Sequence, residues 1–143
     1  MSVQPAYAAV PIGFGPVNFA TANTGRDGTG TIPTIVVGRG PGTRIERVRV
    51  RAAGTTTAGM IRIFKKATGL ARNADGTFAS YTAPTWRLIH EIPVTAITPS
   101  ATVEAFSGEW APTNGHTLAD GEQLGVSTHN AEIFNAEVVG GHI

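Results

Sequence analysis

Residues 43–66, TRIERVRVRAAGTTTAGMIRIFKK, decide the fold class of this chain. Charged and apolar residues alternate through both halves of this stretch, and strand side chains point alternately to two faces. We therefore expect two β-strands that form a hairpin across the GTTTAG connection at 54–59. On the first strand the residues expected on the apolar face are Glu46, Val48, Val50 and Ala52, and those on the opposite face are Arg47, Arg49 and Arg51.

The rest of the chain repeats this pattern of short strands and turns. Among 143 residues there are 18 Gly and 9 Pro, which suits many strands joined by tight turns and argues against a helical bundle. The further strands are expected at 17–23, 31–37, 86–94, 102–110, 122–128 and 133–139. Pro33 favours an edge position for 31–37, and two apolar faces favour a central position for 86–94. We predict an all-β fold, a single antiparallel β-sandwich of jelly-roll type over 17–143.

Residues 1–16 form an extended N-terminal arm in this interpretation. They contain no charged side chain, and Pro5, Pro11 and Pro16 forbid a helix. The arm is too apolar for a solvated tail, so it either packs on its own domain as an edge strand or lies on a neighbouring subunit. The arm residues that we assign to such an interface are Val3, Tyr7, Val10, Ile12 and Phe14.

The longest connection, residues 67–85, is the second candidate for contacts with a partner. Loops of more than about 12–15 residues in compact domains are often functional. Phe78 and Tyr81 give this loop aromatic tips. It is either a recognition loop or a small hairpin that folds over one end of the sheet.

Charge is divided unevenly along the chain. All eleven Lys and Arg lie between Arg26 and Arg87, against three acids, which gives this part +8; the remainder has seven acids and no Lys or Arg, which gives −7. We expect the two parts to meet within or between subunits. The row Arg47, Arg49 and Arg51 then forms a solvated ladder with acids such as Glu104 or Glu137, faces an acidic neighbouring subunit, or binds nucleic acid. We do not expect nucleic acid, because no aromatic residues are interleaved with the basic ones.

No pattern of catalytic or metal-binding residues is present. The chain has no Cys, its serines do not lie in a Gly-x-Ser-x-Gly motif, and its four His lack metal-ligand spacing. His129 and Glu132 either face a cation at a strand end or belong to a solvated turn. Glu104 and Glu109 are expected on opposite faces of one strand, so they do not form a carboxylate pair. We predict no enzyme activity, no cofactor and no metal.

Membrane insertion is not expected either. No apolar stretch approaches the roughly 18 residues of a membrane span, and the N-terminus lacks a signal-peptide pattern. We therefore expect synthesis and folding in the cytoplasm.

Three segments resemble a group of small virion proteins of tailed bacteriophages. These are AGTTTAGMIRIF at 53–64, WRLIHEIPVTAITPSATVEA at 86–105 and STHNAEIF at 127–134. The resemblance implies a non-enzymatic structural protein made in the host cytoplasm, such as a capsid decoration (cement) protein on the capsid surface. It would bind the major capsid protein and stabilise the head as a homo-oligomer, for example a trimer. The resemblance does not include the arm and designates no binding residue.

Two alternatives remain open at this stage. One is a tail or head–tail component with the same fold. The other is a carbohydrate-binding or receptor-binding module that uses Tyr81, Trp86 or Trp110, because aromatic faces stack on sugars.

Overall fold

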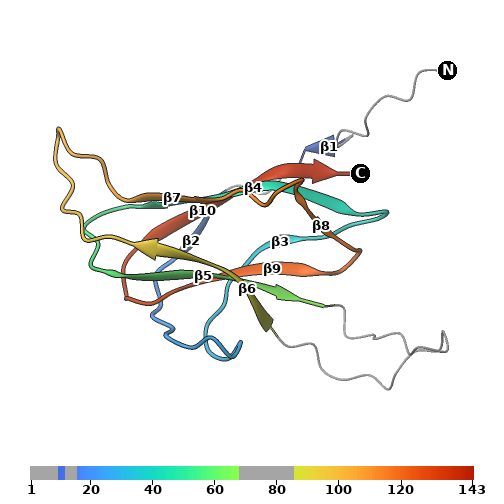
Figure 1. Cartoon of the computed structure of the whole chain (residues 1–143), viewed down its shortest axis with the longest axis horizontal. Helices are drawn as coiled ribbons and strands as arrows, with labels where there is room; N and C mark the ends of the chain where they lie inside the picture. Colours follow the sequence, from blue (N-terminus) through green and yellow to red (C-terminus); the bar gives the residue numbers. More distant parts are fainter. Residues whose placement is uncertain (1–9, 12–15, 68–85) are drawn as a thin grey trace.

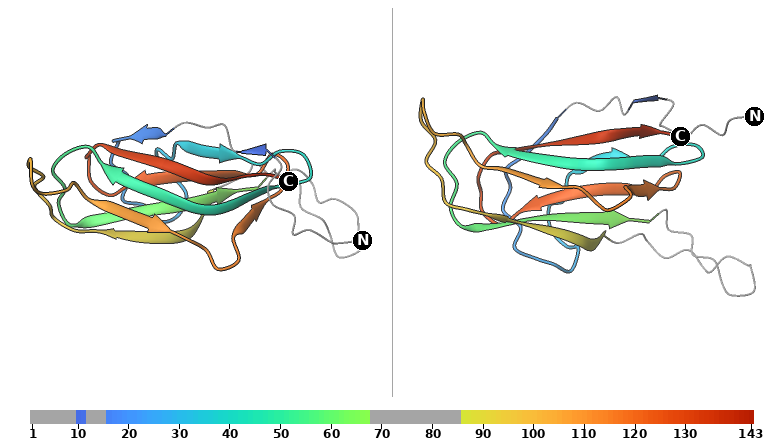
Figure 2. Two further views of the ribbon diagram at one scale, coloured as in Figure 1. Left: turned by 90° about the horizontal axis from the view of Figure 1, so that it is seen from above. Right: turned by 45° about the horizontal axis from the view of Figure 1, so that its top comes forward.

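The chain folds into two antiparallel β-sheets packed face to face, without a helix in the residues described (Figures 1 and 2). The computed structural model describes residues 10–11, 16–67 and 86–143. The predicted all-β sandwich is confirmed. Sheet A contains β1 (Val10–Pro11), β2 (Val17–Phe19), β4 (Thr43–Ala52), β7 (Ser107–Trp110), β8 (His116–Leu118) and β10 (Phe134–His142). Sheet B contains β3 (Thr34–Val37), β5 (Gly59–Lys66), β6 (Trp86–Val94) and β9 (Gln123–Thr128).

Strands from the first half of the chain pair with strands from the second half. Sheet A has the order β1-β10-β4-β7, with β2 also paired to β10 and β8 to β4, and sheet B has the order β3-β9-β5-β6. Thus β2 pairs with β10, β3 with β9, β4 with β7, and β5 with β6. Such nested pairs arise when the two halves of the chain form one long antiparallel ribbon that is then rolled up, as in a jelly roll. The two sheets are observed, and the jelly-roll class remains our interpretation of their connectivity.

Alternating apolar side chains from both sheets form one core. Val48 and Val50 of β4 face Ile61 and Ile63 of β5 and Val126 of β9, all fully buried. Three aromatic rings complete the core near β2, where Phe19 stacks on Phe134 with ring centroids 5.6 Å apart and Phe106 meets Phe134 edge-on. Burial of this apolar surface is the main force that holds the sheets together.

The predicted hairpin between β4 and β5 is wrong, because the two strands belong to different sheets. Residues 53–58 cross from sheet A to sheet B instead of forming a turn within one sheet. Thr56 fixes the crossing: its backbone exchanges hydrogen bonds of 2.9 and 3.1 Å with Ile97, and its hydroxyl donates to the Thr95 carbonyl at 2.7 Å. In sheet A, β4 pairs on one side with β10, which lies more than 80 positions further along the chain, and on the other with β7 and β8.

A β-bulge corrects the predicted position of Glu46. Opposite β10, the register moves from Arg47 to Ile45 between Val139 and Gly140, so Glu46 has no partner residue there. One extra residue shifts the alternation. Glu46 is therefore exposed, and Ile45 is buried in its place. The predicted alternation holds from Val48 to Ala52.

The predicted central position of β6 is also wrong, since β6 is an edge strand of sheet B. Pro93 lies within it, which an edge tolerates because the missing N–H breaks no ladder. The apolar residues on the outer face of β6 are explained by a covering segment and not by a central position in the sheet. The outer face of sheet B is covered by the connection 20–33, and Ile32 and Trp86 meet over Gly125 of β9.

The strand expected at 102–110 is shorter than predicted. The Ser100 hydroxyl oxygen accepts hydrogen bonds from the backbone N–H groups of Thr102 and Val103, both at 3.2 Å, and the resulting turn delays β7 until Ser107. Glu104 therefore does not share a strand with Glu109. Both carboxylates pair with arginines on the outer face of sheet A, so the prediction of opposite faces is wrong. The predicted loop that follows contains the short strand β8.

Candidate interaction surfaces

The arginine row of β4 lies on the outer face of sheet A and pairs with acids of the same chain. Arg47 Nη1 is 3.2 Å and Arg49 Nε 3.8 Å from one Glu109 oxygen, and Arg51 donates to Glu104 at 2.6 Å. Antiparallel register places Glu109 of β7 directly opposite Arg49. All five side chains are substantially exposed. The arginines thus form a ladder with acids of their own chain, with Glu109 in addition to Glu104.

The basic and acidic parts of the sequence meet within one chain. In the described part, six of the seven ion pairs join a Lys or Arg from the first part to a Glu from the second. Exposed pairs of this kind each contribute only about 0–1 kcal/mol to stability. The basic and acidic parts thus neutralise each other locally, partly by strand pairing and partly through the connections that carry Arg26, Glu104 and Glu122.

A partly buried ion-pair cluster on sheet B was not anticipated. Glu91 Oε1 accepts from Arg26 at 2.6 Å and from Arg62 at 3.0 Å, and Arg62 also donates to the Asn23 carbonyl at 3.4 Å. Arg62 is only 2% exposed. The hydrogen bond from Arg26, followed by that from Arg62, holds the pKa of Glu91 below its usual range against the opposing effect of desolvation. The cluster fastens the connection 20–33 over sheet B.

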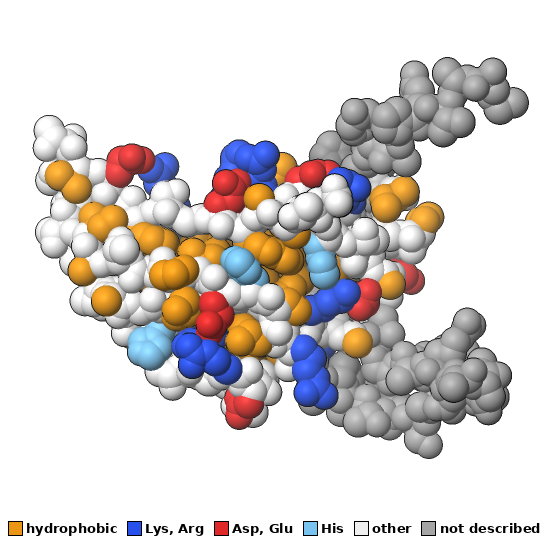
Figure 3. All heavy atoms as spheres, viewed as in Figure 1, with side chains coloured by type: hydrophobic (Ala, Val, Ile, Leu, Met, Phe, Trp, Pro, Cys, Tyr) orange, Lys and Arg blue, Asp and Glu red, His pale blue; other side chains and the backbone are white. Residues whose placement is uncertain are grey.

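Two histidines and a tryptophan line the seam between the edge strands β6 and β7. His90 stacks on Trp110 with centroids 5.6 Å apart, and His116 of β8 lies at the same distance from Trp110, tilted by 52°. Figure 3 shows hydrophobic side chains gathered over this seam between β6 and β7. The ring stack therefore closes this side of the sandwich.

His116 is the polar member of the seam that lacks a hydrogen bond. Its Nε2 atom is buried without a partner. Burial, assisted by the positive charge of Lys65, lowers the pKa of His116, while Glu122 opposes this effect. The imidazole is thus held in its neutral form.

Three connections that are far apart in sequence meet at one end of the sandwich, on the left in Figure 1. We call residues 53–58, 95–103 and 129–133 the low-charge end, because Glu132 is their only Asp, Glu, Lys or Arg; Glu104, which pairs with Arg51, follows directly in the same connection and borders this end. Glu132 Oε1 accepts from the Thr57 N–H at 2.8 Å and from its hydroxyl at 2.6 Å. Asn130 donates to the Thr57 hydroxyl at 2.9 Å. The ladder between Thr56 and Ile97 attaches the third connection.

The low-charge end also exposes large apolar side chains. Val103 is 49% and Ile133 is 52% exposed, and the Ala53 N–H donates to the Ile133 carbonyl at 2.9 Å. Protein interfaces are depleted of charge at their centre. This end is therefore a candidate surface for a protein partner.

The three segments that carry the phage resemblance supply this end. They contribute the Thr56–Thr57 crossing, the residues after β6, and the Asn130–Glu132 turn. Sequence reasoning treated them as separate, since the contacts join residues 39 to 80 positions apart. Their shared resemblance was the only available signal. Glu132 acts here as an acceptor for Thr57, and its second oxygen is buried without a partner.

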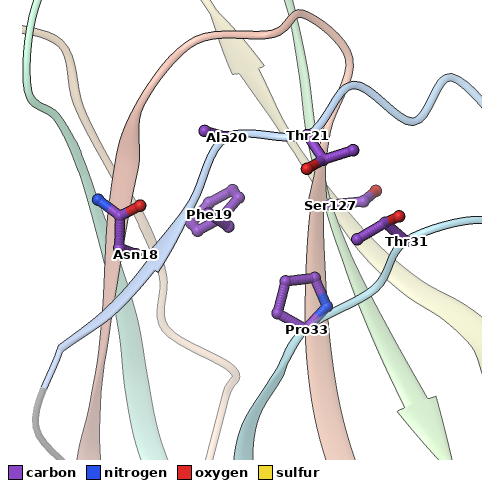
Figure 4. A pocket seen from close by; sticks show the side chains of 7 residues that line it. All are labelled: Asn18, Phe19, Ala20, Thr21, Thr31, Pro33 and Ser127. Carbon is purple, nitrogen blue, oxygen red and sulfur yellow. The ribbon is translucent and has the colours of Figure 1, made fainter.

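A hollow of about 260 Å³ opens at the other side of the sandwich, between β2 and β3 (Figure 4). Ser127 of β9 forms its floor; this side chain is 1% exposed, and its hydroxyl lacks a hydrogen-bond partner. No lining residue is charged. The lining consists of Asn18, Phe19, Ala20, Thr21, Thr31, Pro33 and Ser127.

A second hollow, of about 250 Å³, lies beside the arginine row. It contains both signs of charge, from Arg49, Arg51 and Glu137, and its remaining lining residues are Pro16, Val50, Ser107 and Asn135. Its arginines already pair with carboxylates of the chain.

Most of the predicted interface residues of the arm and loop lie outside the described part of the chain. These are Val3, Tyr7, Ile12, Phe14, Phe78 and Tyr81. Val10 is described: it pairs with His142, and Pro11 pairs with Gly141, at the edge of β10 in the same chain. For these two residues, the arm is an edge strand of its own domain.

Comparison with protein-family models, with curated protein sequences and with solved structures finds no match. Within the described ranges, no group of three or more His, Asp or Glu is placed to hold a metal ion. The same part of the chain contains no helix of the length and hydrophobicity needed to cross a bilayer.

Proposed function

We propose that this chain is a structural protein of a tailed-bacteriophage particle, a capsid decoration protein. It binds the outer surface of the major capsid protein as a homo-oligomer and stabilises the head. The convergence of the three phage-like segments at the low-charge end carries this proposal. Hydrogen bonds of Thr56, Thr57 and Glu132 hold the connections of this end together. Val103 and Ile133 are exposed on it, which is the composition expected of a docking surface for a protein.

The two other assignments have less support. A carbohydrate-binding module needs free aromatic faces, yet Trp110 already contacts His90 and His116, and Lys66 Nζ lies 5.4 Å from the Trp86 ring centroid. A tail or head–tail component would use the same fold, and position in the particle distinguishes it from a decoration protein.

Charge placed on the low-charge end tests the docking surface. Ile133→Arg and Val103→Arg each put a cation on an exposed apolar site, so folding stability should change by no more than about 0.5 kcal/mol. Binding to purified heads that lack the chain should weaken by about tenfold or more, since desolvating an unpaired charge at an interface is costly. Occupancy on sedimented heads measures the effect.

Ile143→Arg is the matched control. Ile143 is 45% exposed and lies beyond the C-terminal end of β10, whereas Ile133 immediately precedes its N-terminal end. The control should bind heads as the parent chain does. Equal loss of binding in Ile143→Arg, or full occupancy by both low-charge-end variants, would contradict the proposed surface.

A further inference from the structure

The hollow between β2 and β3 has a buried polar group without a partner at its floor. Its floor, the Ser127 hydroxyl, is 1% exposed and unpartnered. A buried hydroxyl without a hydrogen bond is destabilising, because it has lost its hydration without gaining a protein partner. An occupant that donates to or accepts from Ser127 offsets part of this loss. The uncharged lining disfavours an ionic occupant, because a charge there would lose hydration without gaining a counter-ion.

The strands that border the hollow are sheet edges. In the described part of the chain, β2 pairs only with β10, and β3 only with β9. An edge strand leaves backbone N–H and C=O groups open on one side. Here β2 offers them, because Pro33 before β3 has no N–H and the carbonyls of Thr31 and Pro33 already accept from Asn23 and Val126. An extended peptide can pair with such an edge, and side-chain pockets beside it give specificity. The hollow is therefore suited to an extended, uncharged segment of polypeptide.

The chain itself contains a segment of this chemistry. Residues 1–9, MSVQPAYAA, have no charged side chain, and nine extended residues span up to about 30 Å. The described start of the arm, β1, lies at the end of β10 that is far from the hollow. Val10 pairs with His142, whereas Phe19, in the hollow, pairs with Phe134 at the other end of β10. β1 runs antiparallel to β10, with Val10 opposite His142 and Pro11 opposite Gly141. The N-terminal end of β1 is therefore directed toward the C-terminal end of β10, away from the hollow.

We propose that the hollow lined by Thr21, Thr31 and Ser127 binds residues 1–9 of a second copy of this chain. The inference deepens the proposed function and rests on its homo-oligomer: exchanged arms link the copies, while the low-charge end contacts the shell. Each copy both gives an arm and receives one, which is the reciprocity that a closed symmetric oligomer requires.

Intermolecular paramagnetic broadening tests the exchange in the full-length chain. The chain has no Cys, so Ser2→Cys takes a nitroxide label at a single site. Labelled chain is mixed with ¹⁵N-labelled chain that carries no nitroxide, so that broadening reports contacts between copies. The amides of Thr21, Thr31 and Ser127 should lose most of their intensity, which reduction of the nitroxide should restore.

Two threonine variants make the test specific. Thr31→Lys adds a charge at the exposed rim of the hollow and should abolish the broadening and weaken self-association by about tenfold or more in sedimentation equilibrium. Thr113→Lys, the control at an exposed turn outside the hollow, should change neither. Broadening that is absent, lies elsewhere, or persists in Thr31→Lys would overturn the inference. Head binding by the parent chain is a separate readout: its loss with intact broadening would contradict only the decoration role.

Discussion

The outer faces of the two sheets carry arginines in the same alternating pattern but in opposite environments. On sheet A, Arg47, Arg49 and Arg51 are substantially exposed and paired across the strands with glutamates. On sheet B, Arg62 is almost completely buried between Glu91 and the Asn23 carbonyl. The difference arises from the connection 20–33, which covers sheet B and leaves sheet A open. The alternation of side chains thus predicts on which face of a sheet a residue lies. Whether that face is exposed to solvent depends on a segment distant in sequence, here the connection 20–33.

This contrast predicts unequal costs of removing an arginine. Arg62→Ala should destabilise the chain by about 3 kcal/mol, because it leaves a cavity, an unpaired Asn23 carbonyl and a Glu91 with one partner fewer. Arg49→Ala should cost less than about 1 kcal/mol, since both partners are exposed. Urea unfolding followed by circular dichroism measures both values. Equal costs would mean that sheet B is not covered as described.

Acid unfolding tests the same cluster with a smaller expected effect. The pKa of Glu91 is lower in the folded chain than its ordinary value of 4.5, so the ionised carboxylate stabilises the fold fully above that value. This contribution is lost as the pH falls below 4.5 through the lowered pKa. Glu91→Gln should remove that part of the acid dependence from the free energy of unfolding, measured by urea titration at successive pH values. An unchanged acid dependence in Glu91→Gln would show that the cluster does not hold the carboxylate ionised.

Local patterns predicted the strands and missed their partners. Alternation placed Val48, Val50 and the arginines of β4 correctly, and β6 begins and ends where its apolar run does. The hairpin was wrong because Thr56 binds residues some 40 positions away, which no local turn signal reveals. The central position of β6 was wrong because its apolar residues pack under a covering connection rather than between two neighbouring strands.

The candidate surfaces were less predictable than the fold. The arginine ladder was anticipated, since opposite charges in alternating strands can meet by simple register. The low-charge end was not, because it exists only when the contacts of Thr57 with Asn130 and Glu132 bring three connections together. The hollow above Ser127 likewise could not be predicted, because its lining comes from three segments that are separate in sequence: residues 18–21, residues 31–33 and Ser127. Arm residues 1–9 and 12–15 and the whole of loop 68–85 lie outside the described structure, so those predictions stand as predictions.

The central claim is that this chain decorates the head of a phage particle through its low-charge end. A cryo-electron-microscopy map of the particle tests it most directly. The account predicts sandwich-shaped density on the outer surface of the head, with residues 53–58, 95–103 and 129–133 facing the major capsid protein. Density in the tail, density inside the head, or a copy on the shell with this end turned to solvent would contradict it.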